Sequence, residues 1–112
     1  MKRDDSVYVH HILDAIEKIE EYTRRVNKET FYSNTLLQDG VIRQIEIIGE
    51  ATKRLSFGLR STYAHIPWQD MAGMRDKLIH DYFGVDIVQV WLTVESDIPA
   101  LKAEIANVLK TL

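Results

Sequence analysis

The sequence predicts a single all-helical domain over residues 1–112, built as a bundle of four to five helices. Apolar residues make up 46% of the 112 residues, while glycine and proline number only 5 and 2. That composition favours helices over a turn-rich β protein and argues against disorder. A folded chain of this length buries roughly two-thirds of the surface that its unfolded form exposes, which is enough for one core.

The first helix is predicted over residues 5–26. Asp4, Asp5 and Ser6 suit an N-cap and first turn, where side-chain oxygens accept hydrogen bonds from backbone N–H groups. Charged residues such as Glu17 and Arg24 fill one face. The other face is apolar, with residues at helical spacing at Tyr8, Ile12, Ile16, Ile19 and Val26.

A second helix is predicted from about residue 33 or 34 to Leu55, after a polar break at residues 27–30. Ile42 and Ile47 extend its apolar surface beyond one stripe, which indicates burial on two sides, by its own bundle and by a partner chain. Gly49 lies inside this helix and lets a neighbouring helix approach closely. The main stripe consists of Leu37, Val41, Ile45, Ile48, Thr52 and Leu55.

Residues 56–66 are expected to form a loop that leads into a third helix. Pro67 suits the first position of that helix, because a residue there has no intrahelical partner for its N–H group. The helix is expected to end near Phe83 and Gly84, since glycine is the preferred residue just past a helix terminus.

Two further helices complete the predicted bundle. Asp86 is expected to cap the first of them, and Asp97 and Pro99 mark the start of the last, which continues to Leu112. The two tryptophans, Trp68 and Trp91, suit core or interface positions better than base stacking.

Charge and cysteine content limit the class of protein. The chain has no cysteine, which excludes disulfides and thiolate metal sites and fits a reducing cytoplasm. The N-terminal residues lack the apolar run of a signal peptide, and no stretch suits a membrane span. His10, His11 and His65 lack the spacing of a metal site, so neither a metal nor a cofactor is expected.

The formal net charge is −3. Any contact with RNA therefore has to come from a local basic patch, or from a groove that forms when two chains meet. A solvated helix face is the default for each basic residue that could line such a groove. These residues are Arg24, Arg25, Lys28, Lys53, Arg54, Arg60 and Lys77.

The candidate site is the octet at residues 75–82, RDKLIHDY. Arg75 falls within the apolar stripe of the third helix, and a buried guanidinium without an acceptor is costly. On spacing alone, the favoured interpretation is a structural ion pair with Glu46 or Glu50 of the second helix.

The octet holds three more polar candidates around the same helix end. Asp76 and His80 are an i, i+4 pair, so Asp76 is placed to orient the imidazole. Tyr82 returns to the face of Arg75, whereas His80 lies about 140° around an ideal helix from it. These residues form a polar cluster but do not by themselves indicate an activity, because a lone histidine near a helix C-terminus is more often structural.

RDKLIHDY resembles the R-x4-H-x-Y motif of HepT-like proteins, the toxin branch of the HEPN superfamily. The resemblance covers nearly the whole chain in the same order, through GVIRQIEIIGEATKRLS at 40–56, IPWQDMAGMRDKLIHDYFGVD at 66–86, VQVW at 88–91 and DIPALK at 97–102. It implies a HEPN-type helical bundle that forms a homodimer, with the motifs of two chains facing a shared cleft.

The resemblance also implies metal-independent cleavage of RNA by the toxin of a type VII-like toxin–antitoxin pair. His80 would be the general base for the ribose 2′-hydroxyl or the acid for the leaving 5′-oxygen, since histidine ordinarily titrates near neutral pH. Arg75 would hold the scissile phosphate through its guanidinium fork. A second His80 from the partner chain would provide both acid and base, and the product would be a 2′,3′-cyclic phosphate.

Tyr82 matches the tyrosine to which, in this family, a minimal nucleotidyltransferase antitoxin transfers AMP. An adenylyl group there would add bulk and negative charge beside Arg75 and His80 and so block RNA. Taken on its own, Tyr82 is also explained as a packing aromatic. Two wider alternatives stay open. One is a catalytically silent module that binds a nucleotide or the nucleotidyltransferase, which the acidic net charge slightly favours, and the other is a structural dimerisation domain.

Overall fold

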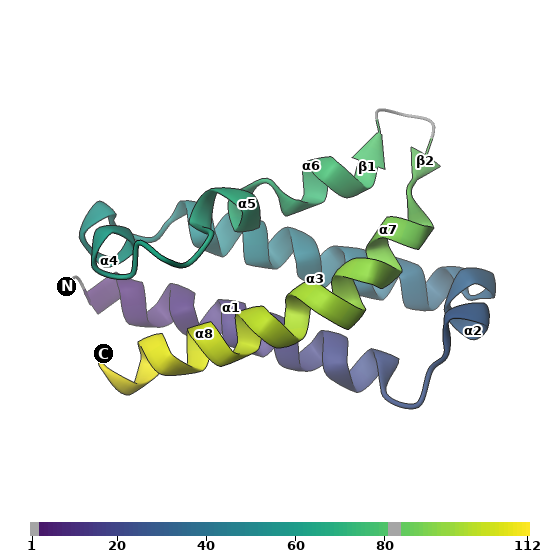
Figure 1. Ribbon diagram of the computed structural model, residues 1–112, viewed down its shortest axis with the longest axis horizontal. Helices are drawn as coiled ribbons and strands as arrows, with labels where there is room; N and C mark the ends of the chain where they lie inside the picture. Colours follow the sequence, from purple (N-terminus) through teal and green to yellow (C-terminus); the bar gives the residue numbers. More distant parts are fainter. Residues whose placement is uncertain (1–2, 81–83) are drawn as a thin grey trace.

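Three long helices carry most of the fold in the computed structural model, which describes residues 3–80 and 84–112. α1 (Arg3–Thr23) lies beside α3 (Thr35–Lys53), and α8 (Ile98–Lys110) packs against α1 (Figure 1). Lys102 of α8 donates to Glu20 of α1 at 2.8 Å, and this carboxylate raises the pKa of Lys102 above its ordinary value. None of the described helices is long and apolar enough to cross a membrane.

The core lies between these three helices and contains most members of the apolar stripes predicted for α1 and α3. Its fully buried members include Ile12, Ile16, Ile19, Val41, Ile45, Ile48, Ile105 and Val108. Burying each such side chain contributes about 1.5–3 kcal/mol. Trp68 and Trp91 are also buried, and the Trp91 ring lies 5.1 Å from that of Phe31. The all-helical prediction and the core positions of both tryptophans are therefore confirmed.

A short helix, α2 (Lys28–Ser33), occupies the segment that was predicted as a polar break. The side chain of Asn27 caps it by accepting from the N–H of Thr30 at 2.8 Å, and Asn34 caps α3 by accepting from Leu37 at 3.0 Å. Because each asparagine satisfies a backbone donor that the helix leaves unpaired, two helices follow one another with a single residue between them.

The predicted loop at residues 56–66 is also wrong in its first half, which forms the helix α4 (Phe57–Thr62). Ser56 caps α4 by accepting from the N–H of Leu59 at 3.1 Å. The buried carboxylate of Asp5 holds this cap in place, since it accepts from the Ser56 hydroxyl at 2.6 Å and from the Ser56 N–H at 2.8 Å. The start of α1 and the start of α4 are thus joined by one carboxylate.

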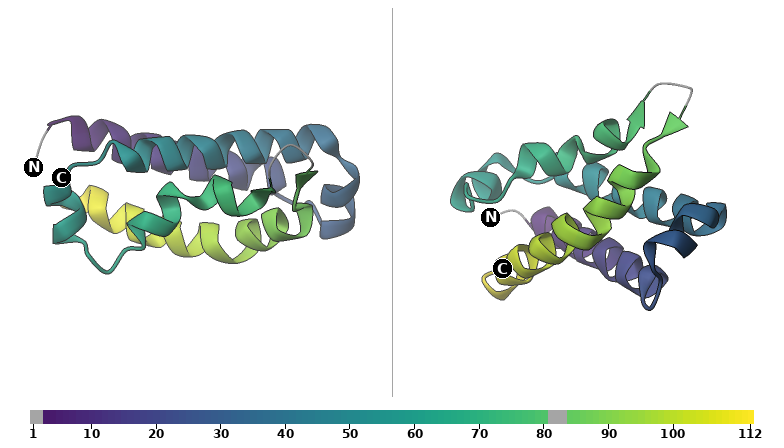
Figure 2. Two further views of the ribbon diagram at one scale, coloured as in Figure 1. Left: turned by 90° about the horizontal axis from the view of Figure 1, so that it is seen from above. Right: turned by 45° about the vertical axis from the view of Figure 1, so that its right-hand side comes forward.

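The predicted third helix is two short helices, α5 (Trp68–Ala72) and α6 (Met74–Leu78), which meet at Gly73. Figure 2 shows this segment running along α3. Pro67 stands at the N-cap, one residue before its predicted place. A glycine in the middle weakens a helix by about 1 kcal/mol relative to alanine, which is a physical reason for the break.

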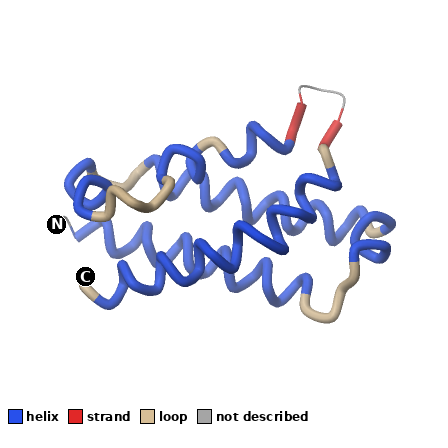
Figure 3. The backbone as a smooth tube through the Cα atoms, viewed as in Figure 1, coloured by secondary structure: helices blue, strands red, loops and turns tan. Residues whose placement is uncertain are grey.

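The third helix also ends earlier than predicted, at Leu78 and not near residues 83–84. β1 (Ile79–His80) and β2 (Gly84–Val85) pair in antiparallel register, Ile79 with Val85 and His80 with Gly84 (Figure 3). Gly84 is therefore a strand residue and not a helix terminus. The β-branched Ile79 adopts extended backbone angles, φ −115° and ψ 111°, in keeping with its strand propensity.

The last two predicted helices form one continuous helical segment. α7 (Ile87–Leu92) runs into a π-helical turn, η2 (Thr93–Asp97), and then into α8. Asp86 caps α7 as predicted, accepting from the N–H of Gln89 at 3.1 Å. A new start at Asp97 and Pro99 is wrong, because the N–H of Ile98 donates to Thr93, five residues back, across the wider turn. Such a turn accommodates a proline, which has no N–H to donate.

Candidate active site

Close packing of α5 on α3 positions the candidate site. A Cβ atom added at Gly49 would lie 3.2 Å from the carbonyl oxygen of Ala72, closer than ordinary van der Waals contact. The two backbones approach this closely because residue 49 has no side chain, as predicted. α6 follows α5 directly, so this contact also determines where Arg75 lies over α3.

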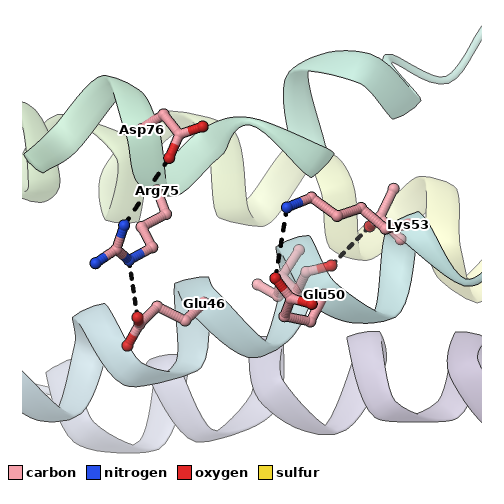
Figure 4. Close-up of polar contacts among 7 residues, drawn as sticks. Glu46, Glu50, Lys53, Arg75 and Asp76 are labelled. Carbon is pink, nitrogen blue, oxygen red and sulfur yellow. Dashed lines mark hydrogen bonds and ion pairs between the residues drawn. The ribbon is translucent and has the colours of Figure 1, made fainter.

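Arg75 extends from α6 toward α3 and contacts Glu46 (Figure 4). Its Nε donates to Oε2 of Glu46 at 2.8 Å, and its Nη1 lies 3.9 Å from Oδ1 of Asp76. The predicted structural ion pair is therefore confirmed, with Glu46 as the partner. Glu50 pairs instead with Lys53, at 3.4 Å.

The exposure of Arg75 differs from the prediction. Its side chain is 47% exposed, so Arg75 does not lie inside a buried stripe. An exposed ion pair contributes only about 0.2–1 kcal/mol to stability. The contact with Glu46 therefore orients the guanidinium more than it stabilises the fold. Figure 4 shows the third guanidinium nitrogen pointing away from both carboxylates.

His80 is described by its backbone alone, which pairs with Gly84 in the short sheet. Because α6 ends at Leu78, Asp76 and His80 do not share a helix, and the expected i, i+4 geometry between them is absent. Tyr82, which was expected to return to the face of Arg75, lies outside the described residues. The catalytic roles of Arg75 and His80, the support from Asp76 and the modification of Tyr82 stay predictions.

A hollow of about 300 Å³ lies between α1 and α3, beside Arg75. We call it the arginine hollow. It is lined by Tyr8, His11, Arg43, Glu46, Glu50 and Arg54, with Ile47 and Ala51 beneath them. Glu46 belongs both to this hollow and to the ion pair with Arg75, so the two features adjoin.

Arg54 is among the basic residues singled out from the sequence, whereas the grouping of Arg43, Tyr8 and His11 with Glu46 was not predicted. Arg43 lies within α3, and Arg54 is its C-cap residue, 11 positions farther along the chain. The available signal was helical spacing, because Arg43, Glu46, Glu50 and Arg54 follow at intervals of three or four residues along one helix face.

A larger groove, of about 690 Å³, lies on the other side of α6, against α7, η2 and α8. We call it the acidic groove. Its floor includes Met71, Met74, Leu78 and Leu101, and its charged lining residues are Asp70, Lys77, Asp86, Asp97 and Glu104. Within residues 3–80 and 84–112, no three His, Asp or Glu side chains are grouped so as to hold a metal ion.

Comparisons with known proteins give a consistent family. A family model described as "Ribonuclease HepT-like" matches residues 12–108. A protein of Thermococcus cleftensis named "Probable ribonuclease HepT" is 47% identical over 110 residues, which cover 98% of this chain and 100% of that protein. No solved structure matches the chain significantly.

A relative from Methanocaldococcus jannaschii is longer than this chain. It is named "Gamma-glutamylcyclotransferase and putative RNase" and is 50% identical over 112 residues, which cover 100% of this chain and 50% of that protein. The chain thus spans about half the length of this relative but the full length of the one from Thermococcus. Together with the family model, these matches show that the chain belongs to the HepT-like family of ribonucleases.

Proposed function

We propose that this chain is a metal-independent endoribonuclease and the toxin of a type VII-like toxin–antitoxin pair, with Arg75 and His80 as its catalytic residues. The observation that carries the proposal is membership of the HepT-like ribonuclease family, combined with an exposed arginine that a neighbouring carboxylate orients. The full octet RDKLIHDY, with its R-x4-H-x-Y spacing, is present in the sequence.

The chemistry needs one base and one acid. The ribose 2′-oxygen attacks the adjacent phosphorus while the 5′-oxygen of the next nucleotide leaves, which closes a 2′,3′-cyclic phosphate. One His80 takes the proton from the 2′-hydroxyl, and His80 of the partner subunit gives a proton to the 5′-oxygen. The reaction therefore neither gains nor loses protons overall, and its need for two imidazoles supports a homodimer with a shared cleft.

Arg75 stabilises the negative charge on the phosphate oxygens as the cyclic product forms. The Glu46 carboxylate holds Nε at 2.8 Å, so the guanidinium is oriented before RNA arrives. The nitrogen that points away from both carboxylates in Figure 4 is the one best placed to meet a phosphate. In this scheme Glu46 is a positioning residue.

Tyr82 is the proposed point of control. A minimal nucleotidyltransferase antitoxin, acting in the cytoplasm, would transfer AMP to its hydroxyl and place a negatively charged group two residues from His80. Mass spectrometry after co-expression with such an enzyme should show an increase on the peptide containing Tyr82, and Tyr82→Phe should abolish it. An unmodified Tyr82 in the presence of active enzyme would remove this part of the proposal.

The test of catalysis uses the purified full chain and total cellular RNA in EDTA. The wild type should cut RNA and leave 2′,3′-cyclic phosphate ends, whereas His80→Ala and Arg75→Ala should not. Arg24→Ala is a matched control, because Arg24 lies in the turn after α1, near Lys102 of α8. Equal cleavage by the wild type and both site variants, or no cleavage by any of them, would contradict the proposal.

The second candidate is a catalytically silent module that binds a nucleotide or the nucleotidyltransferase. The Arg75–Glu46 ion pair favours it, since the pair gives Arg75 a structural partner without any substrate. The two functions differ in cells, because toxicity on expression that disappears with His80→Ala supports the enzyme and excludes the silent module.

A further inference from the structure

The arginine hollow combines aromatic rings with cations on one surface. The Tyr8 and His11 rings meet edge to face, with centroids 5.8 Å apart and planes at 84°. The guanidinium carbon of Arg54 lies 6.0 Å from the centroid of the Tyr8 ring. His11, Arg43 and Arg54 are exposed, while Tyr8 is half-buried. Rings for stacking beside cations for phosphates are the two features of surfaces that bind single-stranded nucleic acid.

The lining of the hollow holds two arginines and two carboxylates, and Tyr8 and Arg54 also border Asp4 and Asp5 in an adjoining hollow. The two carboxylates of the arginine hollow are already paired, Glu46 with Arg75 and Glu50 with Lys53. Within the described parts of the chain, neither Arg43 nor Arg54 forms an ion pair. These two arginines are therefore available to an anion from outside the protein.

The hollow adjoins Arg75 through Glu46, which lines the hollow and accepts from Arg75. Figure 4 shows Glu46 on α3 below Arg75, and Glu50 farther along the same helix beside Lys53. From Arg43 to Arg54 the helix advances about 16 Å, a length that spans several nucleotides. A strand whose scissile phosphate meets Arg75 can therefore continue over α3 without leaving the surface.

We propose that the arginine hollow is the binding subsite for the single-stranded RNA that flanks the cleaved bond. A base stacks on one of the two perpendicular rings of Tyr8 and His11, and Arg43 and Arg54 contact phosphates farther along the same strand on each side. This inference rests on the proposed function and adds to it the direction in which substrate leaves Arg75. The acidic groove is unsuited to the same strand, because its lining has four carboxylates and one cation, Lys77.

The first experiment measures fluorescence anisotropy of a labelled single-stranded oligoribonucleotide in EDTA. The full chain carries His80→Ala, so the probe stays intact. Adding Arg43→Gln together with Arg54→Gln should weaken binding about tenfold or more. It should also flatten the plot of log Kd against log salt by about 1.4, since each lost contact with a single-strand phosphate removes about 0.7.

Two comparisons make this result specific. Tyr8→Leu keeps an apolar side chain against the core but removes the ring, so binding should fall about fivefold or more with an unchanged salt slope. Arg24→Gln removes the same charge as either single site substitution but in the turn after α1, near Lys102 of α8, and binding should stay within about twofold. Equal losses in the Arg43/Arg54 variant and the Arg24 control would overturn the inference.

A second measurement uses the protein without changes to the hollow, in case the double variant fails to fold. An oligoribonucleotide with 5-iodouracil is photo-cross-linked to the His80→Ala chain, and the adduct is mapped by mass spectrometry. Adducts on Tyr8 or His11 support the hollow, whereas adducts confined to residues of the acidic groove overturn it.

Failure of this inference is distinguishable from failure of the proposed function. If the wild type cleaves RNA while the Arg43/Arg54 variant binds and cleaves as well as the wild type, the subsite is wrong and the ribonuclease stands. If the variant loses RNA binding while the wild type never cleaves, the subsite stands and the catalytic proposal fails.

Discussion

The two hollows that flank α6 have opposite chemistry. On the side of α3, Arg75 adjoins the arginine hollow, with its two rings and two arginines that form no ion pair with any other described residue. On the side of α7 and α8, Lys77 and Leu78 face the acidic groove, whose apolar floor is bordered by four carboxylates. One short helix of five residues thus separates a surface suited to an anion from one that repels it. The net charge of −3 for the whole chain therefore does not indicate the charge of either surface.

The strongest test of this difference is to replace each of the two cations of α6 with alanine in turn. Arg75→Ala should lower kcat/KM for RNA cleavage by about 10²–10³-fold, the effect of removing one donor that stabilises transition-state charge. Lys77→Ala should change it little, because Lys77 faces Asp70 at 3.6 Å in the other groove. Initial rates under kcat/KM conditions give both numbers, and similar losses for the two variants would remove the distinction between the two sides.

The position of α6 between the hollows depends on Gly49. Gly49→Val should lower the free energy of unfolding by about 1–3 kcal/mol, because the added side chain meets the backbone of Ala72. Urea denaturation followed by circular dichroism measures this. Gly58→Val is the control, since a Cβ at residue 58 meets nothing closer than 3.8 Å. A stability unchanged by Gly49→Val would mean that α5 and α6 are not held at this distance.

Glu46 should matter for the rate more than for the fold. Glu46→Gln keeps a hydrogen-bond acceptor for Nε but removes the charge, so we expect about a fivefold fall in kcat with little change in KM. The free energy of unfolding should fall by no more than the contribution of one exposed ion pair, about 0.2–1 kcal/mol. A fall in stability with an unchanged kcat would make the pair purely structural.

The smallest expected effect is on the acidic side. Replacing Asp70 and Asp97 with asparagine removes two charges from the acidic groove, and RNA affinity should rise by no more than about twofold, since exposed charges act weakly through solvent. Anisotropy at low and moderate salt measures it. A large gain in affinity would place RNA in this groove.

Apolar spacing predicted the parts of the fold that depend on the long helices. The stripes of α1 and α3 gave most of their core positions correctly, because a long amphipathic helix repeats its signal over many turns. The short helices α2 and α4 were missed because six residues provide fewer than two turns of pattern, and their caps alone, Asn27 and Ser56, are common in turns as well.

The site was predicted less completely for a different reason. The pairing of Arg75 with Glu46 followed from charge and spacing, but the exposure of Arg75 did not, because the break at Gly73 and the early end at Leu78 change which residues share a face. The neighbours Tyr8 and Arg43 are 67 and 32 residues away from Arg75 in the sequence. Their proximity to it depends on how three helices pack, and a pattern within one helix does not contain that information.

The hydrogen bonds between Asp5 and Ser56 limit when the two ends that they join can become structured during synthesis. The two residues are 51 positions apart, so α1 leaves the ribosome long before the partner of its Asp5 carboxylate exists. Until Ser56 emerges, that carboxylate stays hydrated and the first turn of α1 has no anchor. Closure of this contact marks the point in synthesis at which α3 is complete, and a truncation that removes Asp5 would loosen the distant helix α4 together with the start of α1.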